Sequence, residues 1–311
     1  MAGILLIFLV ASSGLYQQDP TALIASGLLA LSPVMVDFSA NGSPYILSTV
    51  LIVSISMLLY HFREGQYWYA ILAGLLCGIG YWLHSSLILL PLAFLIFLLF
   101  PNIFVQPDNP NQKTIFPRTK INWKYLLIFL AAFLCVLASW ILWNFYNFGH
   151  PFYSTSVIYL LDRLGLVKTE IAGDIITIKI TSLKITLVLK RYLLTLAKSM
   201  WVFIREYFLL LGPFCLILVL TGIISLYQNN KRGLVAFILP ATFYTLVIFL
   251  WATYKFRFLI PLLPTTLIFT AYGFTWLIQR KGWLRWLAWM SLVGAFLWML
   301  PYYFRSEPTL Y

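Results

Sequence analysis

The chain has 311 residues, of which 62% are apolar and 10% are charged, and its mean hydropathy is +0.90. Soluble domains carry about 25% charged residues, so the composition excludes a soluble globular enzyme, a disordered chain and a collagen-like fibre. The balance of 21 Lys and Arg against 9 Asp and Glu gives a net charge of +12. In a membrane protein we attribute this charge to short cytoplasmic loops and helix ends, and we expect no nucleic-acid partner.

Ten apolar runs follow one another along the chain, and about 20 apolar residues allow a helix to cross the hydrocarbon core of a bilayer. We therefore expect an all-α fold, in which about ten transmembrane helices form one transmembrane domain over residues 1–311. The runs cover residues 2–16, 21–37, 45–61, 68–83, 86–100, 125–143, 207–226, 234–252, 257–279 and 283–303.

Basic residues set the orientation that we expect in the membrane, because Lys and Arg collect in short cytoplasmic loops. Segment 102–124 holds four of them and is placed in the cytoplasm. Alternating spans then put the long segment 145–206 on the outer side. The short outer segments hold three basic residues, namely Lys255, Arg257 and Arg305.

Residues Leu183–Arg205 of this outer segment predict an amphipathic helix. Its cations recur every seven residues, which is nearly two helical turns, so they line one face. These cations are Lys184, Arg191, Lys198 and Arg205. Two interpretations stay open: the helix contacts lipid headgroups in the membrane surface, or it forms a cationic rail beside a lipid-phosphate substrate.

Polar residues occur at the predicted outer ends of several helices, and we expect them to converge on one outer cavity. They are Asp37, Asn41, His84, Asn144, His150, Lys255 and Arg257. In such a cavity a carboxylate can act as a base and cations can hold a phosphate. The alternative for each residue is a helix cap or a headgroup contact. No ligand cluster in the sequence calls for a metal or another cofactor, and we expect the three cysteines to be free thiols in apolar surroundings.

Four segments of the chain resemble the GT-C superfamily of membrane glycosyltransferases. The likeness is to the bacterial branch related to protein mannosyltransferases, aminoarabinose transferases and lipopolysaccharide-core galacturonosyltransferases. The segments are Ala30–Tyr45, Gly74–His84, Ser139–Pro151 and Arg257–Gly273. Together they span nearly the whole chain.

The resemblance implies an enzyme of the bacterial plasma membrane that moves a sugar from a polyprenyl-phosphate carrier to an acceptor on the extracytoplasmic side. The acceptor would be a glycan, a lipid or a protein. By position, Arg257 with Lys255 would bind the carrier phosphate, and His84, Asn144 and His150 would line the same cavity.

The family opens with one further helix, and the loop after that helix carries its catalytic acidic residue. This chain resembles the family from the second helix onward. Asp37 is therefore the outer carboxylate that we nominate as the base. Two other functions stay open: a non-catalytic membrane protein of the same fold, and a membrane transporter or polysaccharide-handling protein.

Overall fold

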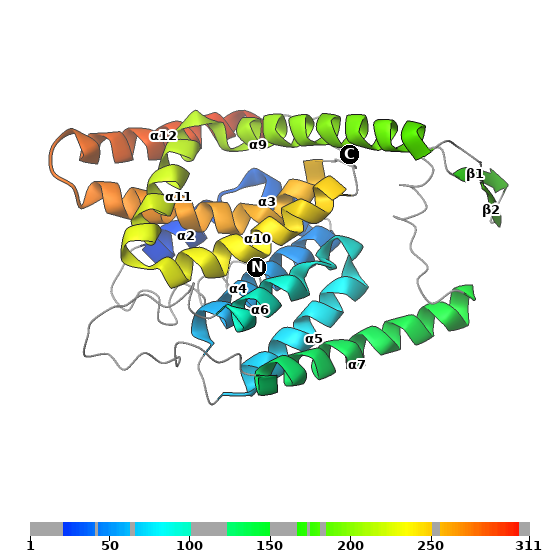
Figure 1. The fold of residues 1–311 in the computed structure, drawn as a ribbon. Coiled ribbons are helices and arrows are strands. Elements are labelled where there is room, and N and C mark those ends of the chain that lie inside the picture. Colours follow the sequence, from blue (N-terminus) through cyan, green and yellow to red (C-terminus); the bar gives the residue numbers. More distant parts are fainter. Residues whose placement is uncertain are drawn as a thin grey trace.

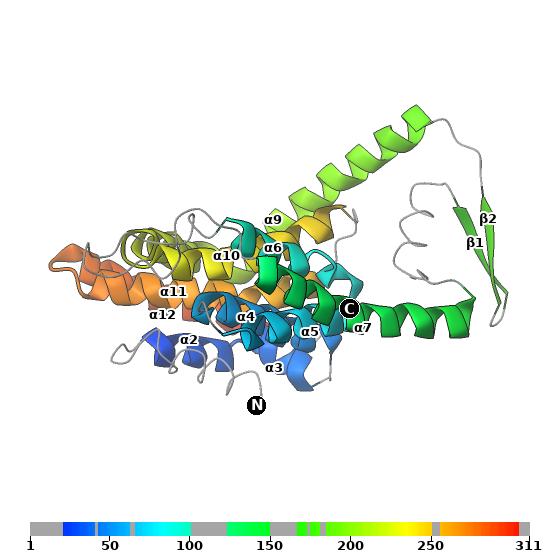
Figure 2. The ribbon, with the colours of Figure 1, turned by 60° about the horizontal axis from the view of Figure 1, so that its bottom comes forward.

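The structure is a computed structural model that describes residues 21–40, 43–62, 66–100, 123–149, 167–172, 175–180, 185–250 and 256–304. Within these ranges the chain forms ten α-helices, two 3-10 helices and one β-hairpin. The helices pack side by side in a bundle (Figure 1). Helix α7 and the beginning of α9 extend beyond the rest of the bundle (Figure 2).

The first described run is broken into two helices, α2 (Thr21–Ala30) and α3 (Pro33–Ala40), whereas one continuous helix was expected over 21–37. Pro33 explains the break, because proline disfavours helical backbone at the residue before it. Helix α4 (Pro44–His61) begins more regularly. The Ser43 side chain accepts a hydrogen bond from the backbone N–H of Tyr45, and Pro44 occupies the first turn, where a missing N–H costs little.

Helices α5 (Trp68–Leu83) and α7 (Trp123–Phe148) form a close pair. A β-carbon at Gly74 would lie 2.5 Å from the carbonyl oxygen of Phe129, and one at Gly78 would lie 2.6 Å from the side chain of Val136. Small residues of this kind let helix backbones approach closely in membranes. After α5 the chain turns through η1 (Ser85–Leu87) into α6 (Leu90–Leu99).

The second half of the chain is built on the long helix α9 (Ile185–Asn229), which bends at Gly212. The bend follows from a left-handed backbone at Gly212, with φ of 70°, and from Pro213 after it. The indole Nε1 of Trp298 donates a hydrogen bond of 2.8 Å to the carbonyl of Leu209 and so occupies an acceptor in the last turn before the bend. The expected amphipathic helix over 183–205 and the expected span over 207–226 are thus parts of one kinked helix.

After its bend, α9 crosses α11 (Figure 1). Helix α10 (Lys231–Leu250), η3 (Phe256–Leu262), α11 (Leu263–Ile278) and α12 (Trp283–Phe304) complete the bundle. At the crossing, a β-carbon on Gly222 would overlap the carbonyl of Phe269, and one on Gly273 would overlap the carbonyl of Leu218. The two backbones are therefore in direct contact.

Four helical segments are long and apolar enough to cross a membrane, and they lie at 123–148, 186–229, 231–250 and 257–278. Three shorter apolar helices lie at 45–61, 68–83 and 90–99. These helices indicate an integral membrane protein. Each predicted run has a helical counterpart except 2–16, which lies outside the described residues, and the number of ten spans stays a prediction.

The fold is all-α apart from a β-hairpin, formed by β1 (Val167–Ala172) and β2 (Ile175–Ile180), which was not expected from the sequence. The strands pair antiparallel, with Ala172 opposite Ile175. In β1 the β-branched residues Val, Thr and Ile alternate with Lys, Glu and Ala, and β2 is mostly Ile. Gly-Asp separates the two strands in the sequence, which is a hairpin pattern. The hairpin lies in the predicted outer segment 145–206. Of the predicted cytoplasmic loop 102–124, residues 102–122 lie outside the described residues.

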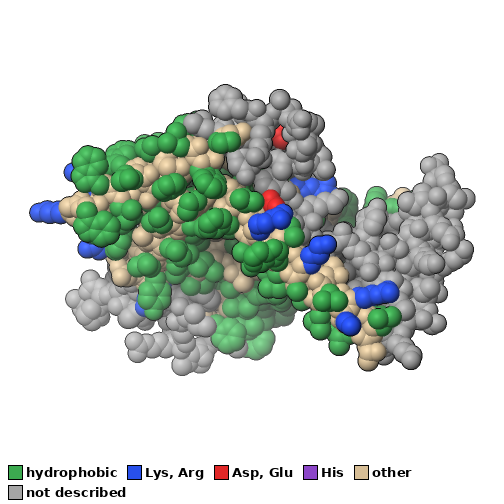
Figure 3. Space-filling model, turned by 90° about the horizontal axis from the view of Figure 1, so that it is seen from above, with side chains coloured by type: hydrophobic (Ala, Val, Ile, Leu, Met, Phe, Trp, Pro, Cys, Tyr) green, Lys and Arg blue, Asp and Glu red, His purple; other side chains and the backbone are tan. Residues whose placement is uncertain are grey.

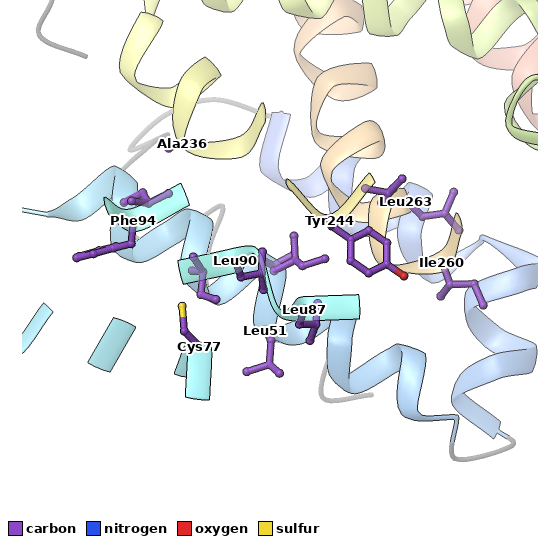
Figure 4. Packing of buried hydrophobic residues seen from close by; sticks show 14 of the residues in the cluster. Leu51, Cys77, Leu87, Leu90, Phe94, Ala236, Tyr244, Ile260 and Leu263 are labelled. Atoms are coloured by element: carbon purple, nitrogen blue, oxygen red, sulfur yellow. The ribbon is translucent and has the colours of Figure 1, made fainter. Parts of the chain in front are cut away.

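Packed side chains from both halves of the chain form one continuous core. Leu87 of η1, Leu90 of α6 and Tyr244 of α10 lie beside Ile260 of η3 and Leu263 of α11 (Figure 4). Lipid tails are as apolar as these side chains, so close packing rather than exclusion of water holds such helices together. This core places η1 next to η3, although more than half of the chain separates them.

One end of the bundle is marked by Arg232 at the start of α10. Its guanidinium donates a hydrogen bond to the carbonyl of Phe62 after α4 and lies 6.0 Å from the ring centroid of Phe97 in α6. Phe62 in turn packs against Tyr125 in the first turn of α7. The start of α7, the end of α4 and the end of α6 therefore meet here, as the predicted alternation of spans requires. We call this the Arg232 end.

Candidate functional site

The predicted site residues His84 and Arg257 come together at the opposite end of the bundle. His84 caps the C-terminus of α5, where its backbone N–H bonds to the carbonyl of Gly80. Arg257 is the second residue of η3. Both side chains contact Tyr45 in the first turn of α4: the His84 and Tyr45 ring centroids are 5.1 Å apart, and the Arg257 guanidinium carbon lies 5.4 Å from the Tyr45 centroid.

Phe258 completes this group, which we call the Tyr45 cluster: Tyr45, His84, Arg257 and Phe258. The Phe258 ring lies 5.6 Å from Tyr45 and 6.1 Å from His84, centroid to centroid. The Arg257 guanidinium also lies 6.0 Å from the Phe258 ring, yet its side chain is exposed. Each cation–π contact at an exposed site contributes about 0.5–1 kcal/mol. The rings of Tyr45 and Phe258 therefore orient the Arg257 guanidinium, and its exposed part remains accessible to a ligand.

His84 is neutral in this setting. Burial lowers the pKa of its imidazole from 6.5 to about 4, and the nearby charge of Arg257 acts in the same direction. The Nδ1 atom lies 2.5 Å from the hydroxyl oxygen of Ser86 and accepts the backbone N–H of Ser86 at 3.2 Å. The cluster thus presents one fixed positive charge beside one neutral imidazole.

The other predicted site residues lie at different places in the structure. Asp37 is exposed in the last turns of α3, which leads within a few residues to Tyr45, so it lies at the same end as the cluster. Asn144 is 2% exposed on α7, whose main packing partner is α5. Lys255, His150 and Asn41 lie outside the described residues. A common cavity for these residues stays a prediction.

The cationic stripe of the predicted amphipathic helix faces away from the bundle. Arg191, Lys198 and Arg205 are exposed on α9, whereas Phe203 is buried on the opposite side of the helical wheel. Lys and Arg side chains line the outward face of α9 (Figure 3). Arg205 pairs with Glu206 at 2.5 Å. Lys184 lies outside the described residues.

A cleft that the sequence analysis missed lies between α9, α10 and α11. It has a volume of about 430 Å³ and mostly apolar walls. Tyr207 and Thr266 line it and are hydrogen-bonded to each other. The buried hydroxyl of Thr265 also belongs to its wall. Leu262, the last residue of η3 and five residues after Arg257, is also among the lining residues. In the sequence, the hydroxyl side chains within the apolar runs were the feature that could have indicated this cleft.

Metal ligands are not concentrated anywhere in the described part of the chain, where no group of three or more His, Cys, Asp or Glu side chains could hold an ion. The three cysteines are free, as expected: Cys77 and Cys215 are buried and Cys135 is exposed. The Tyr45 cluster offers the Arg257 guanidinium and the His84 imidazole for binding by charge and hydrogen bonds.

Comparisons with protein-family models, with curated proteins and with solved structures gave no match to this chain. Its function is therefore argued from the chemistry of its own residues.

Proposed function

We propose that the protein is a glycosyltransferase of the bacterial plasma membrane, with a GT-C type of helical bundle. It moves a sugar from a polyprenyl-phosphate carrier to a glycan, lipid or protein acceptor on the extracytoplasmic side. One observation carries the proposal: the exposed Arg257 guanidinium and the His84 imidazole both contact the Tyr45 ring. A fixed cation at a helix end, at the edge of an apolar bundle, suits a phosphate on a lipid.

The reaction would be a displacement at the anomeric carbon. The bond from this carbon to the phosphate oxygen breaks, and its electron pair stays on the phosphate, next to Arg257. The acceptor hydroxyl oxygen forms the new bond to the anomeric carbon and gives its proton to a carboxylate. This direct displacement inverts the anomeric configuration. Asp37, exposed at the same end, is the base that we propose. Because charge grows on the phosphate as the bond breaks, Arg257 contributes most in the transition state.

Two further features support a lipid-linked substrate. The apolar cleft between α9, α10 and α11 is lined in part by Leu262, which follows Arg257 by five residues in the sequence, and it has room for part of an isoprenoid tail. The outward cations Arg191, Lys198 and Arg205 of α9 suit anionic headgroups. This favours headgroup contact over a rail for the substrate phosphate, because the stripe points away from the bundle.

The test is binding of undecaprenyl phosphate and of undecaprenol, which lacks the phosphate, to the purified chain in nanodiscs. We expect the phosphate lipid to bind at least tenfold more tightly, and Arg257→Ala to remove this preference. Arg285→Ala is the matched control, because Arg285 is an exposed cation of α12 next to the turn from α11. Equal binding of the two lipids, or an unchanged preference in Arg257→Ala, would overturn the proposal.

A further inference from the structure

The hydrogen bonds of His84 fix which of its ring nitrogens carries the proton. The backbone N–H of Ser86 can only donate, and it points at Nδ1 from 3.2 Å. Nδ1 must therefore present a lone pair. The Ser86 hydroxyl, 2.5 Å from the same atom, then donates to that lone pair as well. The single proton of the neutral ring is consequently on Nε2.

Protonation of the ring would disturb this arrangement. An added proton on Nδ1 would face the Ser86 N–H, and the ring charge would lie close to Arg257, which acts on His84 electrostatically. The other groups around the ring do not offset this cost. Tyr45 of α4 and Phe258 of η3 present ring faces and edges, and Tyr244 of α10 lies near Ser86 and Tyr45. Asp37 lies at the same end of the bundle, but among the described residues the one charge that acts on the pKa of His84 is that of Arg257, which disfavours an imidazolium.

We propose that Ser86 is a positioning residue that holds His84 in its neutral form with the proton on Nε2, so that Nε2–H is the second donor to the phosphate held by Arg257. This inference rests on the proposed function for the identity of the ligand, whereas the tautomer rests on the geometry of the turn from α5 into η1 alone. Among the described residues Nε2 makes no hydrogen bond, and His84 is partly exposed. The donor is thus available to a ligand.

Charge matching supports this division of roles. The phosphodiester of a sugar-linked carrier has one negative charge, and the described cluster offers one positive charge and one neutral donor. After the sugar leaves, the phosphate monoester carries up to two negative charges. The hydrogen bond from Nε2–H strengthens as this charge develops, without a proton having to move. His84 in this tautomer is therefore a donor to the leaving group, and its one basic lone pair, on Nδ1, is already engaged by Ser86.

The tautomer can be read directly from nitrogen NMR of the full chain with ¹⁵N-labelled histidine. The chain has three histidines, and His84→Asn identifies the His84 signals. We expect Nδ1 to be unprotonated and Nε2 protonated throughout pH 5.5–8. Ser86→Ala removes the hydroxyl donor but keeps the backbone N–H, so it should raise the minor population protonated at Nδ1 without reversing the preference for Nε2. Ser86→Thr should restore the wild-type signals, and Ser85→Ala should leave them unchanged. A protonated Nδ1 in the wild type would overturn the inference.

The donor role is tested with undecaprenyl phosphate in nanodiscs. Loss of one hydrogen bond to a charged group should weaken binding about tenfold in His84→Phe and several-fold in Ser86→Ala. Unchanged binding in both variants, with Arg257→Ala still defective, would overturn the inference and leave the proposed function standing. If the wild type does not prefer the phosphate lipid over undecaprenol, the proposed function fails and the donor role fails with it. The NMR result still decides whether Ser86 sets the tautomer.

Discussion

The guanidinium carbon of Arg257 lies 5.4 Å from the centroid of the Tyr45 ring. The two residues belong to η3 and to the first turn of α4, and these elements pack against each other. Because Arg has many rotamers in solution, a ring on one side reduces the entropy that it loses on binding a ligand. The packing of η3 on α4 therefore preorganises the Arg257 side chain for binding a ligand.

The Tyr45 ring, rather than its hydroxyl, should matter for the site. We expect Tyr45→Ala to weaken binding of undecaprenyl phosphate about two- to fivefold, which corresponds to one cation–π contact at an exposed position. Tyr45→Phe should bind normally, since it keeps the ring. Tyr67→Ala is the control, because Tyr67 stacks on Tyr125 at the Arg232 end. A defect of Tyr45→Phe as large as that of Tyr45→Ala would show that the hydroxyl, not the ring, is needed.

Acid should destabilise the protein through His84. Its pKa is about 4 in the folded chain and 6.5 without the fold, so between these values the unfolded chain binds a proton that the folded chain does not. The free energy of unfolding therefore falls as the pH drops from about 6.5 to about 4. Allowing for partial exposure, we expect a loss of the order of 2 kcal/mol. Thermal unfolding in detergent measures this, and the His84→Gln variant should lose less stability than the wild type over the same pH range. Identical pH profiles of stability for the two proteins would contradict the assignment to His84.

The order and position of the helices followed from the apolar runs, but their breaks depend on local backbone chemistry. Pro33 divides the run over 21–37, and Gly212 with Pro213 bends α9 instead of ending it. The sequence contained both signals. What it lacked was the partner of the bend: the indole of Trp298 bonds to the Leu209 carbonyl, and such a long-range contact is set by the packing of α12.

Two of the four residues of the Tyr45 cluster could be predicted from the sequence, and the other two could not. His84 and Arg257 stood out because charged and polar side chains are few in the short outer segments predicted for so apolar a chain. Tyr45 and Phe258 did not stand out, since aromatic residues make up 18% of the sequence and are common at membrane interfaces. The role of Ser86 depends on the direction of one N–H in η1, which no pattern of residue types reveals.

Two glycines should respond to alanine with opposite signs. Gly273 lies where α11 crosses α9, and a β-carbon there would overlap the carbonyl of Leu218, so Gly273→Ala must push the two backbones apart. We expect a loss of several kcal/mol or a failure to fold. Gly27 of α2 has open space around it, and Gly27→Ala should stabilise by up to about 1 kcal/mol. Thermal unfolding of the two variants in the same detergent compares them, and similar shifts would refute the crossing geometry.

The two ends of the bundle should lie on opposite sides of the membrane, with the Tyr45 cluster outside. Tyr146, which is 90% exposed near the end of α7, and Lys281, between α11 and α12, are suitable positions for single cysteines in a Cys135→Ala background. A membrane-impermeant maleimide should label Tyr146→Cys in intact cells and Lys281→Cys only after permeabilisation. The reverse pattern would place Arg257 in the cytosol and contradict transfer on the extracytoplasmic side. Labelling of both from one side would instead contradict the alternation of spans between these residues.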